Sequence, residues 1–399
     1  MDENRHIGER IAVHRNKRGL SQAVLAGMVG RSVSWLSQLE RGERTVDKLS
    51  VLLPMARALR VDLAELVGEP VDFTPTAGPS LNAIDRIRSA MSYYLPADDD
   101  ERQVGLDTLH SVSVEIMSLY QAAKYNKAAS LLPVTIREAD NAVARSEDEE
   151  QRRALRIQAL TNQVASALFN RTGQTELGWV AADRAIGAGR QLGDIELVTA
   201  GIYRLGQVML RAGRSEEAYM LADSTISTID GSDRPSAMSL HGALLLTAAI
   251  AAARLDNRKE STKYIAQAQE IAERLGGNRN DHWTAFGPTN VRIHATSAAV
   301  SLGDPSEVII QGETVDAGSL PEQLKGRRSQ VYIDMAWAHS QQQNDTAAIL
   351  SLMEAERLAP EAVRFNPLAR DLIQTAIHRS RKSAVPGLDG LAARTGVVA

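Results

Sequence analysis

The 399-residue sequence contains no cysteine, few aromatic residues and no long apolar run. Without cysteine there is no disulfide framework, no thiolate metal site and no cysteine nucleophile. The longest apolar run, 243–253, is shorter than the roughly 18–20 residues of a membrane span, and the basic N-terminus lacks a signal-peptide core. These absences predict a soluble protein of a reducing compartment, the cytoplasm, with no membrane partner.

The remaining composition favours helix, because Ala, Leu, Glu, Arg and Gln are abundant while aromatic residues are only 4%. We therefore predict an all-α protein. Its net charge of −4 is unevenly distributed, since residues 10–44 hold seven basic and two acidic residues. A local basic segment of this kind suits contact with nucleic acid, even in a chain that is acidic overall.

Proline and glycine mark a domain boundary. Residues 68–80 contain three prolines and two glycines, which disfavour regular structure and predict a linker. Before it we predict a small domain of five short helices over residues 1–67. After it, residues 81–399 read as one long helical domain.

The long domain contains a recurrent pattern of helix breakers 40 to 49 residues apart, each followed five residues later by a small or apolar residue. Each interval accommodates two helices, which predicts a solenoid of stacked helical hairpins. The pattern resembles the tetratricopeptide repeat (TPR), so we expect a TPR-like α-solenoid. The breaker pairs are Lys124/Ala129, Gly173/Gly178, Gly213/Ala218, Asn257/Thr262, Gly303/Val308 and Asn344/Ile349.

Residues 20–42 predict two short helices separated by a glycine turn. Ser21 and Ser32 are suitable N-caps, and Gly30 ends the first helix. At 100° per residue the second helix has an apolar face and an opposite, mostly polar face. A polar helix face fits the major groove of DNA, where Gln can pair with adenine and Val can meet a thymine methyl group. The residues of this face are Val33, Ser34, Ser37, Gln38 and Arg41.

The motif over residues 5–67 resembles the lambda-repressor/Cro helix-turn-helix family, also called the xenobiotic-response-element (XRE) family. The resemblance implies a transcription regulator that binds a double-stranded DNA operator. Gln38 is the main candidate base reader, while Ser21, Gln22, Arg41 and Arg44 are candidates for phosphate contacts. The predicted DNA-binding residues are Ser21, Gln22, Ser32, Val33, Ser34, Ser37, Gln38, Arg41 and Arg44.

The resemblance also implies a partly buried ion pair between Arg15 and Glu40. Two positions depart from the family pattern. Pro54 lies inside the predicted fourth helix, and Arg60 stands where a helix-ending glycine is usual. A bent fourth helix would alter the dimer contact of the family.

TPR proteins line a concave groove with the first helix of each hairpin, and the resemblance places polar residues of this chain there. Asn and Gln can bind a peptide backbone, and Arg can bind a carboxylate through two hydrogen bonds. Each could instead be an ordinary solvated side chain. The predicted groove residues are Gln163, Asn170, Arg171, Tyr203, Gln207, Arg211, Thr247, Arg254, Asn290 and Asp334.

The domain combination resembles the peptide-pheromone regulators of the Rgg and PlcR group, which act in quorum sensing. Actinobacterial regulators are similar in two further segments, 286–294 and 354–360. We predict a homodimeric regulator, for instance a repressor, whose solenoid senses a peptide or small molecule. Two alternatives are a scaffold that binds a protein partner, and a constitutive repressor whose solenoid only dimerises. The operator, the effector and the sign of regulation remain open.

We expect no enzymatic activity, cofactor or metal. The sequence has no His-Glu-x-x-His, no Gly-x-Ser-x-Gly and no phosphate-binding Gly-x-x-x-x-Gly-Lys-Ser/Thr. Its eight histidines are scattered along the chain. The pattern therefore predicts binding rather than catalysis.

Overall fold

The computed structural model is built of α-helices and describes residues 3–42, 44, 49–59, 61, 66, 81–92, 104–229, 231–380 and 385–397. Its contacts divide it into two compact units, Met1–Phe73 and Thr74–Ala399. No strand occurs in the described ranges, so the all-α prediction is confirmed. The predicted linker, 68–80, lies outside the described residues.

The N-terminal unit has a core of apolar side chains from all of its described helices, among them Ile11, Leu25, Leu36 and Met55, which are fully buried. The predicted fifth helix, 62–67, lies outside the described residues except for the buried Leu66. The helices are α1 Glu3–Lys17, α2 Gln22–Met28, α3 Val33–Glu40 and α4 Leu49–Leu59.

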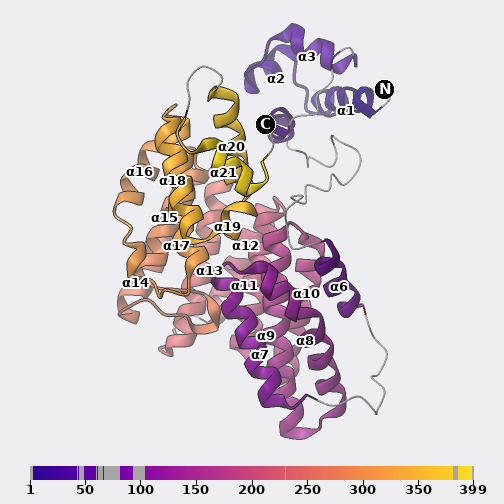
Figure 1. Cartoon of the computed structure of the whole chain (residues 1–399), viewed down its shortest axis with the longest axis vertical. Helices are drawn as coiled ribbons and strands as arrows, with labels where there is room; N and C mark the ends of the chain where they lie inside the picture. Colours follow the sequence, from indigo (N-terminus) through magenta and orange to yellow (C-terminus); the bar gives the residue numbers. More distant parts are fainter. Residues whose placement is uncertain are drawn as a thin grey trace. The chain divides into compact units, whose positions relative to one another are not determined.

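In its described residues the second unit is an array of six helical hairpins (Figure 1). A further helix, α6 (Leu81–Met91), packs on the second helix of the first hairpin. The C-terminal end is covered by α19 Pro360–Arg364, α20 Pro367–Ser380 and α21 Leu388–Thr395. The hairpins are α7 Leu106–Gln121 with α8 Tyr125–Arg145, α9 Asp148–Thr172 with α10 Thr175–Leu192, α11 Ile195–Arg211 with α12 Ser215–Ile229, α13 Pro235–Arg254 with α14 Arg258–Leu275, α15 Pro288–Ser301 with α16 Pro305–Glu313, and α17 Lys325–Gln341 with α18 Asp345–Leu358.

The first helices of the hairpins form the inner layer. Each of them packs on the first helix of the next hairpin, whereas the second helices pack mainly on first helices. The predicted TPR-like arrangement of stacked hairpins is confirmed. Two short 3-10 turns, Asp281–Trp283 and Ala317–Ser319, lie in the longer connections after α14 and α16.

Each hairpin turn contains one residue in the left-handed conformation, and the residue five positions later is buried between the two helices. The predicted breakers Gly173, Gly213 and Gly303 adopt this conformation, with φ of 83°, 79° and 72°. In the other three turns the left-handed residues are Ala123, Asp256 and Gln343. The buried residues are Ala128, Gly178, Ala218, Ser261, Val308 and Ala348.

The predicted breakers lie between the two helices in all six hairpins, and in the first, fourth and sixth they come one residue after the left-handed residue. Lys124, Asn257 and Asn344 each follow the left-handed residue and begin the next helix, where both asparagines accept a hydrogen bond as N-caps. Thr262 is exposed as a result, and Ser261 is buried in its place. The pattern misled because glycine and asparagine favour the left-handed region, whereas Ala, Asp and Gln occupy it here at some cost.

The C-terminal end of the array contacts its first hairpin. The ring of Tyr125, at the start of α8, lies 5.8 Å from the ring of Phe365, and the angle between their planes is 70°. The backbone N–H of Asn126 donates to the carboxylate of Glu361 at 2.9 Å. One hydrophobic cluster thus joins the first hairpin to α19, and the repeats enclose their inner helices rather than leaving an open arc.

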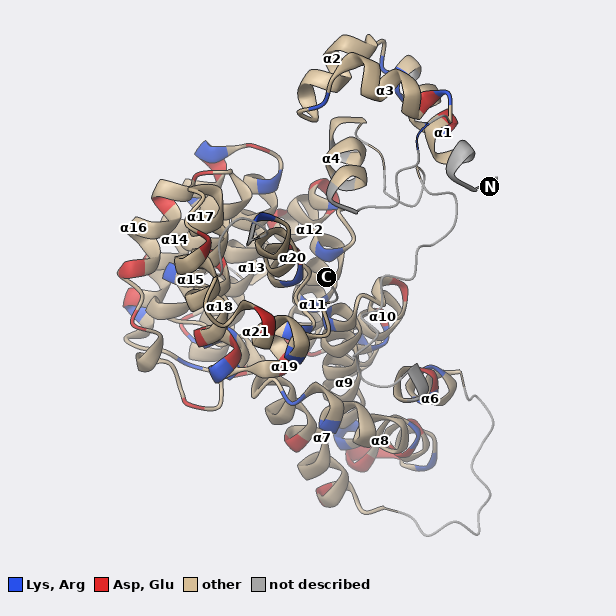
Figure 2. Cartoon of the chain, turned by 45° about the horizontal axis from the view of Figure 1, so that its top comes forward, with Lys and Arg blue, Asp and Glu red and all other residues tan. Residues whose placement is uncertain are grey.

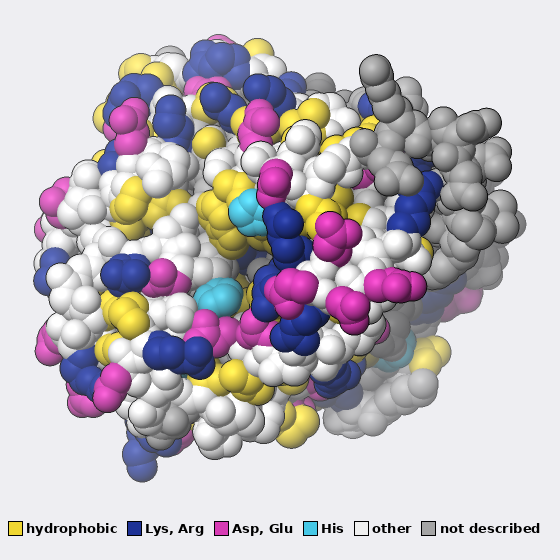
Figure 3. All heavy atoms as spheres, turned by 90° about the horizontal axis from the view of Figure 1, so that it is seen from below, with side chains coloured by type: hydrophobic (Ala, Val, Ile, Leu, Met, Phe, Trp, Pro, Cys, Tyr) yellow, Lys and Arg dark blue, Asp and Glu magenta, His cyan; other side chains and the backbone are white. Residues whose placement is uncertain are grey.

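Among the described residues, α13 alone is long and apolar enough to cross a membrane by length and composition. In the structure 83% of its apolar stretch is buried against neighbouring helices. On the face drawn in Figure 3, hydrophobic side chains form small patches separated by charged ones. The helix is a core element of the repeat unit.

We expect Gln343→Gly to stabilise the repeat unit by about 0.5–1 kcal/mol, because glycine adopts a left-handed φ without the steric cost of a Cβ atom. Gln343 has φ of 62° and is exposed, so no other contact is lost. The neighbouring Gln342→Gly is the control, since Gln342 is exposed with φ of −81° and should be destabilised by glycine. Thermal unfolding of the full chain measures both, and equal shifts of the two midpoints would contradict the assignment.

Candidate functional site

Helices α2 and α3 are joined by a tight turn at Gly30, which has φ of 64°. The hydroxyls of Ser21 and Ser32 cap the two helices, each accepting a hydrogen bond at 3.2 Å from the backbone N–H three residues later. Both predicted N-caps are confirmed. The free N–H groups at these helix starts can bind an anion such as a phosphate group.

The predicted DNA-reading face of α3 is accessible. Ser32, Val33 and Ser34 are exposed, and the apolar side of the helix is formed by the buried Leu36 and Leu39. Ser37 and Gln38 are half-buried. The hydroxyl of Ser37 accepts a hydrogen bond from Arg41 at 2.6 Å, which directs that guanidinium along the exposed face.

An ion pair between Arg15 of α1 and Glu40 of α3 holds the helices together. Their side chains are joined by two hydrogen bonds, Nε to Oε1 at 2.6 Å and a second guanidinium nitrogen to Oε2 at 2.9 Å. Only 12% and 6% of the two side chains are exposed. The hydrogen bond to Glu40 raises the pKa of Arg15. The predicted pair is confirmed.

Gln22 joins this pair, because its amide donates to Oε2 of Glu40 at 2.7 Å. Three helices, α1, α2 and α3, are therefore connected through one carboxylate. Gln22 is predicted to contact phosphate, and in this arrangement its side-chain amide is already engaged within the protein. This role of Gln22 was not evident from the sequence, because the pattern does not show which side chains meet.

Trp35 lies between two arginines. The guanidinium carbons of Arg31 and Arg44 are 5.3 Å and 5.8 Å from its ring centroid. Figure 2 shows that α2 has no charged residue and α3 has only Glu40, so positive charge gathers at the ends of the helices. This distribution offers neutral side chains to base edges and cations to the flanking phosphates.

Two short capped helices with an exposed polar face on the second define a helix-turn-helix DNA-binding protein. The helix-turn-helix domain family matches residues 6–67. The chain is 39% identical over 75 residues to y4dJ, an uncharacterized helix-turn-helix-type transcriptional regulator of Sinorhizobium fredii, and the match covers 19% of this chain and 95% of that protein. The chain belongs to the helix-turn-helix transcriptional regulators. Since these proteins are not enzymes, the predicted lack of catalysis is confirmed.

Among solved structures, PlcR of Bacillus thuringiensis, in complex with the peptide PapR7 and DNA, is similar at 13% identity and a TM-score of 0.30, covering 94% of this chain and 98% of that one. The apo form of the competence regulator ComR of Streptococcus vestibularis is similar at 13% identity and a TM-score of 0.27, covering 96% and 99%.

On the inner helices of the repeat unit, three predicted groove residues lie close together, Arg171, Arg211 and Arg254. Each is in the last turn of an inner helix. The guanidinium of Arg171 lies 5.6 Å from the ring centroid of Tyr125, and Arg254 donates to the carbonyl of Leu210. Burial lowers the pKa of Arg211 to about 10, with the positive charges of Arg171 and Arg254 contributing.

The other predicted groove residues are mostly engaged within the protein. Gln207 donates to the hydroxyl of Thr247 at 3.0 Å, and Tyr203 is buried beneath the guanidinium of Arg204, 5.1 Å from its ring centroid. Gln163 is 2% exposed. Asn170 is half-buried, and its Oδ1 has no hydrogen-bond partner among the described residues.

Asp334 and Asn290 lie farther along the array. Asp334 is 2% exposed and accepts hydrogen bonds from Ser297 at 2.5 Å and Gln330 at 2.9 Å. Burial raises the pKa of Asp334 to about 7. Asn290 is also buried and donates to the carbonyl of Thr284 at 3.5 Å. The structure does not join these two residues to the arginines by any contact that it describes.

Sequence reasoning missed two inner residues, Gln121 and Arg204. Both donate hydrogen bonds to the carbonyl of Trp283, at 3.2 Å and 3.3 Å. Gln121 is the last residue of α7, three positions before the first breaker, and Arg204 follows the predicted Tyr203. Asn170 and Arg254 also stand three positions before a breaker, so the same spacing applied to the first hairpin would have indicated Gln121.

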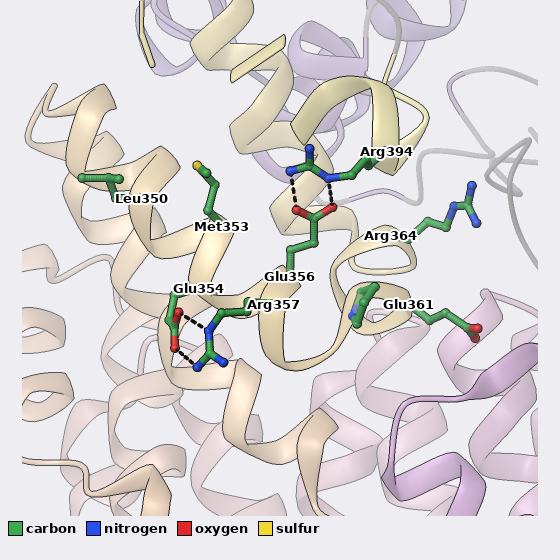
Figure 4. A pocket seen from close by; sticks show the side chains of 9 residues that line it. Leu350, Met353, Glu354, Glu356, Arg357, Glu361, Arg364 and Arg394 are labelled. Atoms are coloured by element: carbon green, nitrogen blue, oxygen red, sulfur yellow. Dashed lines mark hydrogen bonds and ion pairs between the residues drawn. The ribbon is translucent and has the colours of Figure 1, made fainter. Parts of the chain in front are cut away.

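A pocket of about 670 Å³ lies between α18, α19 and α21 (Figure 4). Its charges are largely paired already. Glu354 binds Arg357 at 2.7 and 2.8 Å, and Glu356 binds Arg394 at 2.7 and 2.9 Å. The segment 354–360 therefore has a structural explanation, since it connects α18 to α19 and places the buried Ala359 in the core of the first hairpin.

Removing either partner of the Arg15–Glu40 pair should cost about 3–5 kcal/mol, because the remaining charge is buried without its counterion. Removing both side chains should cost less stability than the sum of the two single losses. We expect a coupling energy above about 1 kcal/mol in a double-mutant cycle of Arg15→Ala and Glu40→Ala. Hydrogen–deuterium exchange of residues 7–40 in the full chain measures the four stabilities, and strictly additive losses would refute the coupling.

Proposed function

We propose that the repeat unit of this DNA-binding transcriptional regulator is a sensor, and that its inner face binds an anionic peptide or small molecule. The observation that carries the proposal is the cluster of Arg171, Arg211 and Arg254 on three successive inner helices. Arg171 is hydrogen-bonded to Tyr120, and neither Arg171 nor Arg211 forms an ion pair with a carboxylate of the described residues.

Placing like charges together in a partly buried site is unfavourable unless something compensates for them. The last turn of a helix favours cations, and this effect explains part of the arrangement. It does not require three arginines to converge. A carboxylate would offset the repulsion and accept two hydrogen bonds from one guanidinium, which makes it the ligand chemistry that the cluster favours. The ten predicted groove residues remain proposals, with these arginines the strongest.

We further propose a cytoplasmic homodimer, with residues 1–67 reading DNA, residues 68–80 as linker and residues 81–399 as sensing and dimerisation domain. The recognition helix itself is nearly uncharged, so each subunit makes few phosphate contacts. Two subunits on a palindromic operator double those contacts. A ligand that prefers one arrangement of the repeats changes operator affinity by no more than its difference in affinity for the two states.

Gln38→Ala should lower affinity for the operator by about 1–3 kcal/mol, roughly 5- to 150-fold, because a paired contact to a base is lost. Affinity for unrelated DNA should not change, since phosphate contacts are intact. Gel-shift titrations at fixed salt, with an operator found by genome-wide mapping of bound DNA, measure this. Val13→Ala is the control, being an exposed α1 residue away from the proposed face. Equal losses on both DNAs would exclude base reading by Gln38.

The ligand is tested with a pool of synthetic heptapeptides carrying free C-terminal carboxylates, compared with the same pool amidated. We expect the free-acid pool to change operator affinity by about fivefold or more, within the usual range of allosteric coupling. Arg211→Ala should abolish the response and leave operator affinity without peptide unchanged. Arg190→Ala, an exposed arginine in the last turn of the outer helix α10, should respond like the unaltered chain. Operator affinity that is indifferent to both pools would count against the sensor.

A further inference from the structure

The connection between α14 and α15, residues 276–287, lies against the inner helices instead of projecting from the array. Its end is anchored by Phe286, which is fully buried against Gly242 of α13. The contact is so close that a Cβ atom added to Gly242 would lie 1.9 Å from the ring of Phe286. The segment is therefore held in place by packing that only glycine permits.

The inner helices hold this segment through its backbone. The carbonyl of Trp283 accepts from the amide of Gln121 and from the guanidinium of Arg204. Gln121 also exchanges two hydrogen bonds with the side chain of Asn280, at 3.0 and 2.8 Å, and Asn290 donates to the next carbonyl, that of Thr284. Side-chain donors that bind consecutive main-chain carbonyls provide the contacts by which an extended peptide is recognised.

The surface that holds the segment retains polar atoms to which the segment does not hydrogen-bond. The Nε of Arg204 and the Oδ1 of Asn290 are buried and have no hydrogen-bond partner among the described residues. Only 6% and 2% of these two residues are exposed. Buried polar atoms are almost always paired in proteins, so the surface has more hydrogen-bonding capacity than residues 280–285 use.

The backbone of the segment is also strained. His282, Trp283 and Ala285 have φ of 47°, 60° and 54°, a left-handed conformation that costs free energy in residues other than glycine. The strain is maintained by further contacts, such as those of His282 with Glu196 at 2.9 Å and of Asp281 with Ser239 at 3.0 Å. A strained segment with incomplete hydrogen bonding is easier to displace than a relaxed one.

We propose that Gln121, Arg204 and Asn290 form a peptide-binding site that the chain occupies with its own residues 280–285, and that an external peptide takes their place. The side chain of Trp283 packs against the cluster that contains Tyr125 and Phe365. The external peptide therefore carries an aromatic side chain at the equivalent position. This inference rests on the proposed sensing role of the inner face, and it identifies how that face is kept occupied without ligand.

The probe is a fluorescein-labelled, N-acetylated and C-amidated peptide with the sequence of residues 279–285. In a full-length variant, residues 280–285 are replaced by a Gly-Ser stretch of equal length, which removes the internal occupant. By fluorescence anisotropy we expect the peptide to bind this variant at least tenfold more tightly than it binds the unaltered chain. A peptide of the same composition in scrambled order should bind neither the variant nor the unaltered chain. If the folded variant binds both peptides equally, the site does not exist as proposed.

If the Gly-Ser variant does not fold, a point variant tests the proposal instead. In the full chain, Gln121→Ala should make residues 279–285 exchange amide hydrogens at least tenfold faster, because the three hydrogen bonds of Gln121 to Asn280 and Trp283 are lost. Gln341→Ala is the matched control, since Gln341 is likewise the last residue of an inner helix but is exposed. Identical exchange in the two variants overturns the inference. Neither measurement uses DNA, so a carboxylate response through Arg211 that survives their failure leaves the proposed function standing.

Discussion

The close approach of the two helices in each hairpin is the constraint on which the repeat unit depends. A left-handed residue ends the first helix, and five residues later a small or buried residue permits contact. A Cβ atom added to Gly178 of α10 would lie only 3.5 Å from the carbonyl oxygen of Ser166 on α9. Because this register recurs six times, each hairpin presents its first helix to the same side. The first helices then pack on one another and enclose an inner surface. The surface on which we propose a binding site is therefore a consequence of the turn geometry.

The inner surface is polar where a stable core would be apolar. Buried polar atoms on α9, α11 and α15, including those of Asn170, Arg204 and Asn290, lack partners among the described residues. A buried charge or amide costs stability unless it is paired, and well-packed apolar residues would serve stability better. The chain retains a guanidinium at Arg211 whose pKa is lowered by burial and by its neighbours. These buried polar residues do not add to stability, so they favour the proposed binding role of the inner surface.

Much of this organisation could be predicted from the sequence, because it is local. The caps Ser21 and Ser32, the face of α3 and the glycine turns follow from residues within one or two helical turns. The left-handed residues Ala123, Asp256 and Gln343 were not predicted, since no propensity marks them as left-handed. The pairing of Gln121 with Asn280 joins residues 159 positions apart, and no periodicity reports such a contact. Long-range polar contacts are therefore the part that only the structure supplies.

The DNA-binding unit and the repeat unit use buried charge in opposite ways. In the first, the carboxylate of Glu40 binds both Arg15 and Gln22 and connects three helices, so this buried charge is fully paired. Helix α3 is held in place by this pair and carries no charged residue but Glu40, which suits the proposed reading of base edges. In the second, the guanidiniums of Arg171 and Arg211 form no ion pair with a carboxylate of the described residues. A fully paired site holds one conformation, whereas an incompletely paired one gains free energy from a partner. This difference supports placing the proposed sensing role in the repeats rather than in the helix-turn-helix unit.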